Sequence, residues 1–134
     1  MISFKTIGGL FVARADASSR LVNWVSYADA MHDSALVVCH AGHGTLMQAL
    51  RQGVPVLAVA HSGDMPENAA RIDWAGVGVR LPWRLVSPTT LRLAVGRALE
   101  SRQALATRAA ELSAWAALND GPTRASELLE KLTG

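Results

Sequence analysis

The sequence is poor in the features that build disulfide frameworks and membrane spans. It contains one cysteine, Cys39, which excludes an internal disulfide and is typical of a protein of the reducing cytoplasm. The longest apolar runs, such as Val54–Ala60, are far too short to cross a bilayer. The first 20 residues lack a signal-peptide pattern, because Lys5 and Arg14 bracket a short segment that glycines interrupt. We therefore expect a cytoplasmic chain without a membrane span.

Charge of one sign is also not concentrated in any block. Lysine and arginine number 13 and aspartate and glutamate 11, which gives a net charge of +2. The arginines of the C-terminal half are spread along helical patterns, as on solvated helix faces, whereas a nucleic-acid site needs a clustered basic patch. We therefore expect no nucleic-acid partner. With 134 residues, 50% of them hydrophobic, the chain is large enough for one domain with one core.

Apolar runs of strand length alternate with helical patterns along the first two thirds of the chain. The runs are Ile7–Ala13, Leu21–Val25, Ala35–Cys39, Val54–Val59 and Val77–Leu81. The third and fourth are continuously apolar, which is typical of strands buried on both faces. Strands that alternate with helices predict an α/β fold with a Rossmann-like parallel sheet.

The predicted helices have recognisable ends. Short helices are expected over Tyr27–Met31, which Ser26 can cap, and over Leu46–Arg51. Asp64 is expected to cap the next helix with Glu67 as its capping-box partner. That helix ends at Gly76. From Ser87-Pro88 onward the chain is expected to be helical, with three apolar stripes: Leu91, Val95 and Ala98; Leu105, Ala109, Leu112 and Ala116; Ala125, Leu128, Leu129 and Leu132.

The loop His40–Thr45, HAGHGT, follows a predicted strand and precedes a predicted helix. Parallel sheets bind ligands at the carboxyl ends of their strands. Gly42 and Gly44 remove side chains where the backbone turns, so that the N–H groups of the helix N-terminus can bind an anion. Thr45 adds a hydroxyl and His40 a ring N–H. The loop is therefore predicted to hold the phosphates of a nucleotide.

These residues alone leave a plainer interpretation open, in which the two glycines form a tight turn and Thr45 caps the helix. A Walker loop is excluded because Gly-Lys-Ser/Thr is missing, and the dinucleotide fingerprint because position 47 is Met47. His40, His43, His61 and Asp64 could suggest a metal site. We expect none, because the first two histidines lie across a turn without a Cys or carboxylate at close spacing. Cys39 is expected to be an inert core residue.

Four segments together form a pattern known from one family. They are Trp24-Val25, HAGHGTLMQALRQGVP from His40 to Pro55, Asp64-Met65-Pro66-Glu67-Asn68-Ala69, and Ala75-Gly76-Val77-Gly78. In this order and spacing they resemble W-(V/A)-P, H-x-G-x-G-T-x-x-E-A-L-x-x-G-V-P, P-x-x-x-D-Q-x-x-N-A and A-G-x-G. Residues 20–81 thus resemble the C-terminal nucleotide-sugar-binding domain of family 1, GT-B-fold glycosyltransferases, most closely the bacterial natural-product and macrolide type.

The resemblance implies roles for individual residues. Trp24 matches the aromatic residue that stacks on the nucleotide base, with the Val25 backbone beside it, although a core tryptophan is the alternative. His40 matches the histidine that contacts the diphosphate, and the loop from Gly42 through Gly44 to Thr45 matches the phosphate donors. Asp64 matches the residue that hydrogen-bonds the hydroxyls of the donor sugar. The implied nucleotide-sugar site is Trp24, Val25, His40, Gly42, Gly44, Thr45, Gln48, Asp64, Met65 and Asn68.

The sequence also departs from the family pattern. Gln48 replaces the glutamate expected at the ribose hydroxyls, and Met65 replaces the glutamine that contacts sugar hydroxyls. Ala41 replaces a common glycine. The family's N-terminal acceptor domain and its catalytic histidine are not matched, since only about twenty residues precede Trp24. We therefore expect an incomplete C-terminal half of a GT-B fold: a single nucleotide-sugar-binding domain over 1–134, N-terminally truncated, with no catalytic residue of its own.

The expected function is the donor-binding part of a glycosyltransferase. It would move a hexose from a nucleoside diphosphate sugar to a small hydroxylated acceptor, with the UDP- or TDP-sugar as substrate and no cofactor, and would be inactive alone. The partner would be a separate chain carrying the acceptor domain, or a second copy. Two alternatives stay open: a non-catalytic nucleotide-binding or dimerisation module, and an inactive fragment.

Overall fold

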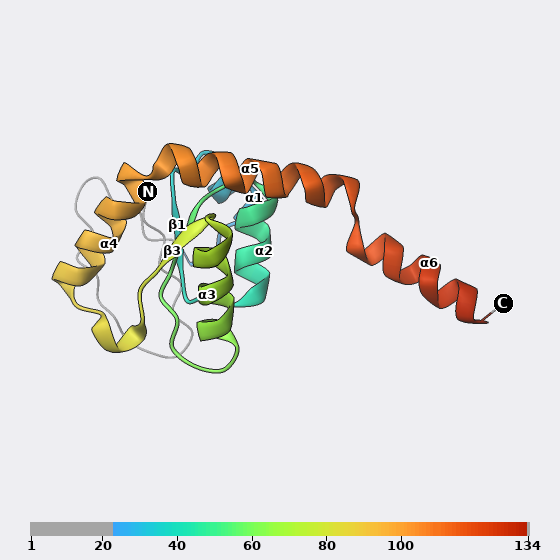
Figure 1. Ribbon diagram of the computed structural model, residues 1–134, viewed down its shortest axis with the longest axis horizontal. Helices are drawn as coiled ribbons and strands as arrows, with labels where there is room; N and C mark the ends of the chain where they lie inside the picture. Colours follow the sequence, from blue (N-terminus) through green and yellow to red (C-terminus); the bar gives the residue numbers. More distant parts are fainter. Residues whose placement is uncertain (1–22, 134) are drawn as a thin grey trace.

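The fold is built on a small parallel sheet, in a computed structural model that describes residues 23–133 (Figure 1). The strands are β1 (Val37–Cys39), β2 (Val56–Ala58) and β3 (Gly78–Arg80), in the order β1-β2-β3. The helices are α1 (Tyr27–His32), α2 (His43–Arg51), α3 (Met65–Ala75), α4 (Pro88–Glu100), α5 (Arg102–Leu118) and α6 (Gly121–Thr133), with a 3-10 turn at Trp83–Leu85. The predicted α/β fold with a parallel sheet is confirmed.

The central strand, β2, carries the core. Its three residues, Val56, Leu57 and Ala58, are all fully buried. β2 pairs in parallel with both neighbours, since Val56 lies opposite Val37 of β1 and opposite Gly78 of β3. β1 is half-buried along its length, so the prediction that it is buried on both faces is wrong. It pairs only with β2 among the described strands, and an edge strand is covered on fewer sides.

The prediction of a strand at 21–25 is wrong over its described part. Residues 23–25 form no strand and lead directly to Ser26, the N-cap of α1. Trp24 is 78% exposed and Val25 is half-buried, so residues 23–25 do not show the continuous burial of a core strand. The predicted strand at 7–13 lies outside the described residues.

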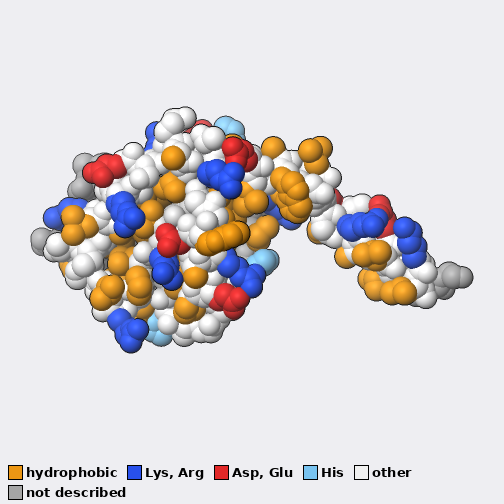
Figure 2. All heavy atoms as spheres, viewed as in Figure 1, with side chains coloured by type: hydrophobic (Ala, Val, Ile, Leu, Met, Phe, Trp, Pro, Cys, Tyr) orange, Lys and Arg blue, Asp and Glu red, His pale blue; other side chains and the backbone are white. Residues whose placement is uncertain are grey.

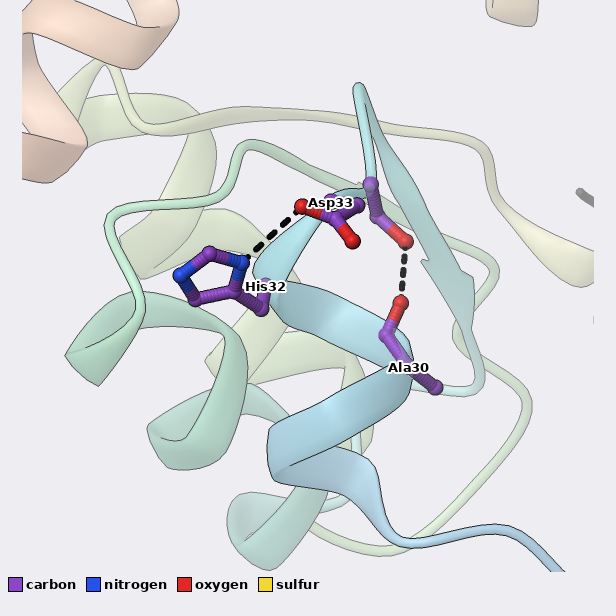
Figure 3. Close-up of polar contacts among 4 residues, drawn as sticks. Ala30, His32 and Asp33 are labelled. Carbon is purple, nitrogen blue, oxygen red and sulfur yellow. Dashed lines mark hydrogen bonds and ion pairs between the residues drawn. The ribbon is translucent and has the colours of Figure 1, made fainter.

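The start and end of α1 are held by side chains. Ser26 Oγ accepts a hydrogen bond from the Asp29 N–H at 3.5 Å, as predicted. At the other end, Ser34 Oγ donates to the Ala30 carbonyl at 2.6 Å, and His32 Nδ1 lies 2.9 Å from Asp33 Oδ1 (Figure 3). The helix ends where the backbone N–H groups of Asp33 and Ser34 donate to the Met31 carbonyl, after which the chain leads to β1.

Two glycines, Gly76 and Gly78, lie where the chain passes from helix α3 to strand β3. Gly76 ends the helix as predicted, in the left-handed conformation at φ 69°, which glycine adopts without steric cost. Gly78 lies so close to the β2 backbone that a Cβ there would collide with the Val56 carbonyl oxygen and with Ile72 Cγ2. Gly76 thus allows the turn after α3, and Gly78 allows β3 and α3 to approach the central strand closely.

The C-terminal helices differ in how well they are packed. Ser87 caps α4 and Ala98 is buried, as predicted, and Ser87 also forms a capping box with Thr90. Helix α5 buries Leu105 and Ala109 and crosses the C-terminal end of α2, where Ser113 Oγ donates to the Arg51 carbonyl at 2.7 Å. No helix within 23–133 is long and apolar enough to cross a membrane.

Helix α6 projects from the body of the molecule (Figure 1). Its apolar stripe does not join the core, since Leu128, Leu129 and Leu132 are 48%, 63% and 83% exposed. Figure 2 shows the charged and the hydrophobic side chains of this arm on different sides. The third predicted stripe therefore exists as an amphipathic pattern but not as a buried contact in residues 23–133.

Candidate functional site

The HAGHGT loop, residues 40–45, joins the carboxyl end of β1 to α2. The helix begins at His43, earlier than the predicted start at Leu46, and Gly42 is its N-cap. The first intrahelical bond runs from the Leu46 N–H to the Gly42 carbonyl at 3.1 Å. Thr45 therefore stands in the first turn of the helix, where N–H groups have no intrahelical acceptor.

The N-terminus of α2 lacks a capping side chain. Gly42 makes no side-chain cap bond, and the first turn contains no acidic residue. A Cβ at Gly44 would meet nothing within 4 Å, so the backbone there can be approached closely. A helix N-terminus with accessible N–H groups attracts anions. The uncapped start of α2 fits the predicted anion-binding turn, and the binding of an anion there stays a prediction.

The imidazole of His40 lies over this N-terminus. A Cβ built at Gly42 would collide with His40 Nε2, which shows that the ring is folded against the N-cap residue. His40 is exposed, so its ring nitrogens remain accessible to a ligand held at the start of α2. A side chain at position 42 would move this ring away from the start of α2.

The turn between β1 and α2 passes through a left-handed residue that is not glycine. Ala41 has φ 67° and is fully buried. This conformation is costly for a residue with a Cβ, which gives a physical reason for the glycine that the family pattern has here. The Ala41 carbonyl accepts a hydrogen bond from Asn68 Nδ2 at 3.2 Å.

Asn68 joins this turn to the second loop of the site. Its Nδ2 also donates to Asp64 Oδ2 at 2.9 Å. Asp64 is the N-cap residue of α3, as predicted, but its side chain makes no cap bond. The predicted capping box is wrong, because the Asp64 carboxylate accepts from Asn68 and Glu67 pairs with Arg71. Both Asp64 and Glu67 thus have partners other than the helix N-terminus.

A shallow hollow lies beside α2. It encloses about 470 Å³ and is lined by residues 24–28 and Gln48. Trp24 is exposed, so the interpretation as a core tryptophan is wrong. Gln48 stands four residues after Gly44 in α2, and residues at this spacing share a helix face. The face of α2 that carries Gly44 and Gln48 therefore extends from the helix N-terminus, beneath His40, to the hollow.

The remaining residues that the sequence singled out are Met65, Cys39 and the histidines. Met65 is partly buried and packs against the core. Burial raises the pKa of the Cys39 thiol, and a backbone hydrogen bond from Ala41 offsets part of this rise, which agrees with an unreactive cysteine. His40, His43, His61 and Asp64 do not form a metal-binding group: within 23–133 no three such side chains gather.

One aromatic contact at this edge was not predicted from the sequence. The rings of His61 and Trp83, which follow β2 and β3, lie 5.0 Å apart at 80°. The backbone N–H of Trp83 donates to the Ala60 carbonyl at 3.1 Å. The signal that could have found this pair is positional, since both residues follow the carboxyl ends of neighbouring parallel strands.

The parallel sheet, the HAGHGT loop and the spacing of the motifs fit the C-terminal domain of a GT-B-fold glycosyltransferase, and comparison with known proteins shows the family. The chain belongs to the family described as "Erythromycin biosynthesis protein CIII-like, C-terminal domain", whose model matches residues 11–132. The resemblance to the bacterial natural-product type is thereby confirmed.

Individual proteins show the same relationship. Zeaxanthin glucosyltransferase of Pseudescherichia vulneris is 34% identical over 133 residues, which cover 92% of this chain and 30% of that protein. The glycotransferase of kitacinnamycin is similar in structure, with a TM-score of 0.79 and 27% identity over 93% of this chain and 32% of its own. Glycosyltransferase VinC in complex with dTDP has a TM-score of 0.65 and 27% identity over 70% and 24%. The chain spans 16–30% of the length of the curated relatives it matches.

Proposed function

We propose that this chain is the donor-binding part of a glycosyltransferase. It holds a nucleoside diphosphate sugar while the sugar passes to a small hydroxylated acceptor. The observation that carries the proposal is the uncapped N-terminus of α2, with the His40 ring folded over Gly42 and open space at Gly44. A diphosphate placed there would accept hydrogen bonds from backbone N–H groups and from His40.

The position of the other groups fits the remainder of such a donor. The hollow beside α2 offers the exposed indole of Trp24 as a stacking surface for the base, with Gln48 close to the ribose. At the other side, one oxygen of Asp64 is held by Asn68, which leaves the second oxygen for a sugar hydroxyl. The structurally similar glycosyltransferase VinC was solved in complex with dTDP, which supports a nucleoside diphosphate as the ligand.

The chemistry that this part can supply is stabilisation of the leaving group. Negative charge grows on the diphosphate as the bond to the sugar breaks, and fixed N–H donors lower the energy of that state. Gln48 can hydrogen-bond the ribose but carries no charge. Met65 packs on the core and offers no polar group to the sugar. We therefore expect weaker discrimination among sugars than an aspartate–glutamine pair would give.

The proposal includes inactivity of this chain alone, because no base for the acceptor hydroxyl is assigned among its residues. Calorimetric titration with UDP, dTDP and UDP-glucose tests binding, and a transfer assay with simple hydroxylated acceptors tests activity. The expected result is saturable one-to-one binding of a nucleoside diphosphate without transfer. Absence of binding by all three ligands would contradict the donor site, and transfer by the purified chain would contradict its inactivity.

A dimerisation module is the second candidate, and exposed apolar side chains favour it. Trp74 and Leu118 are 90% and 87% exposed, and large apolar side chains of this kind become buried where two chains associate. Sedimentation velocity over a concentration series tests this. A dimer that binds no nucleotide supports the module, whereas a monomer that binds UDP or dTDP supports the donor site alone.

A further inference from the structure

Asn68 makes two hydrogen bonds that cross the site, and both use the same nitrogen. Nδ2 donates to the Ala41 carbonyl at 3.2 Å and to Asp64 Oδ2 at 2.9 Å. Both partners are acceptors only, so the amide nitrogen must face them. The two N–H bonds of the amide are thereby occupied. Asn68 has no donor left for a ligand, although the family pattern groups it with the binding residues.

The two acceptors belong to different parts of the fold. Ala41 lies between β1 and α2, and Asp64 lies at the start of α3, with Asn68 one turn later on the same helix. Ala41 is separated from Asn68 by 27 residues. The amide therefore connects the loop that approaches the phosphates with the carboxylate that approaches the sugar.

The connection bears on a strained residue. Ala41 has φ 67°, a conformation in which a Cβ crowds the backbone and which only glycine adopts without steric cost. A hydrogen bond to the Ala41 carbonyl fixes the peptide that follows, and that peptide leads into the N-cap Gly42. The orientation of the first N–H groups of α2 thus depends on the Asn68 amide.

We propose that Asn68 is a positioning residue. It holds the left-handed turn at Ala41 and the carboxylate of Asp64 in one arrangement, so that the phosphate and sugar ends of the donor site are set together. This inference rests on the proposed function for its effect on ligand binding, but the hydrogen bonds exist in the free chain. The same side chain therefore has a measurable effect without any ligand.

The test combines Asn68→Ala with Ala41→Gly. Glycine adopts the left-handed conformation without the cost that alanine has, so it should replace the support that Asn68 gives to the turn. We expect Asn68→Ala to weaken binding of UDP or dTDP about tenfold, on the scale of one hydrogen bond. Adding Ala41→Gly should bring the dissociation constant back to within about threefold of the original.

Asn119→Ala is the matched control, because that amide donates to the Trp115 carbonyl at the end of α5, and it should leave binding unchanged. An undiminished affinity in Asn68→Ala, or a loss that Ala41→Gly does not restore, would overturn the positioning role. A residue that contacts the ligand directly would not be rescued in this way.

Amide hydrogen exchange on the free chain separates this inference from the proposed function. The Leu46 N–H, which bonds to the Gly42 carbonyl, reports opening of the first turn of α2. Asn68→Ala should speed its exchange about tenfold and the double variant should slow it again. If the original chain binds no nucleotide, the proposed function fails while this readout still decides the role of Asn68. An unchanged exchange rate overturns it.

Discussion

Replacing Gly44 with alanine tests whether this position is glycine because a ligand approaches it or because the fold leaves no room for a side chain. Gly44 lies in the first turn of α2, and a Cβ there meets nothing within 4 Å. Alanine is favoured over glycine in helices by about 0.5–1 kcal/mol. Gly44→Ala should therefore stabilise the fold and raise the melting temperature by about 2–5 °C. If the backbone at Gly44 approaches a phosphate, the added methyl group should weaken binding.

The loss of affinity follows from the same geometry. A methyl group at the helix N-terminus would push a phosphate away from at least one N–H donor, and a hydrogen bond to a charged group contributes about 1.5–3 kcal/mol. We expect UDP or dTDP to bind about 10–150 times more weakly. Differential scanning calorimetry and isothermal titration give the two quantities on one sample.

Gly96→Ala is the matched control for this experiment. Gly96 lies in α4, and a Cβ there also meets nothing within 4 Å. It should raise the melting temperature similarly and leave nucleotide binding unchanged. A lower melting temperature in Gly44→Ala would refute the open space at that position. An unchanged affinity in Gly44→Ala, with clear binding by the original chain, would refute the assignment of α2 as the phosphate site.

Three further predictions concern single positions. His40→Ala and Thr45→Ala should each weaken nucleotide binding by about 1–3 kcal/mol without loss of the fold, and titrations that match the original chain would contradict the contact. Gly78→Ala should lower the free energy of unfolding by at least about 1–3 kcal/mol, because the added Cβ collides with the Val56 carbonyl; urea unfolding measures this, and an unchanged midpoint would contradict the close approach. Since burial raises the pKa of Cys39 above its ordinary 9.0, the thiol should react slowly with iodoacetamide near neutral pH. The stability that Cys39 contributes should be complete below about pH 9 and should fall as the pH rises toward the folded pKa. Cys39→Ser should remove this fall. An identical pH profile of the free energy of unfolding in both chains would contradict the prediction.

Local patterns in the sequence were sufficient for much of the fold. Helix ends such as Ser26, Ser87 and Gly76 were predicted because each acts through its own neighbours. The strand predicted at 21–25 is wrong over residues 23–25, since periodicity reports apolar character but not how deeply a segment is buried. The start of α2 was placed too late because glycines at 42 and 44 have low helix propensity, yet the turn begins as soon as Gly42 supplies an N-cap.

The site was harder to predict where one side chain has several possible partners. The spacing of Asp64 and Glu67 is that of a capping box, but each side chain instead pairs with the residue four positions later, Asn68 and Arg71 respectively. The bond from Asn68 to the Ala41 carbonyl spans 27 residues, and no local pattern encodes it. The HAGHGT loop, by contrast, was predicted because strand, glycines and helix are contiguous in the sequence.

The most direct test of the donor-site proposal is a map of amide chemical shifts during titration with UDP and dTDP. We expect the largest changes on the N–H groups of residues 42–45 and on the indole N–H of Trp24, with smaller changes near Asp64. Residues of α4 and α6 should not respond. Shifts confined to those helices, or none at saturating nucleotide, would contradict the claim that the N-terminus of α2 holds the diphosphate.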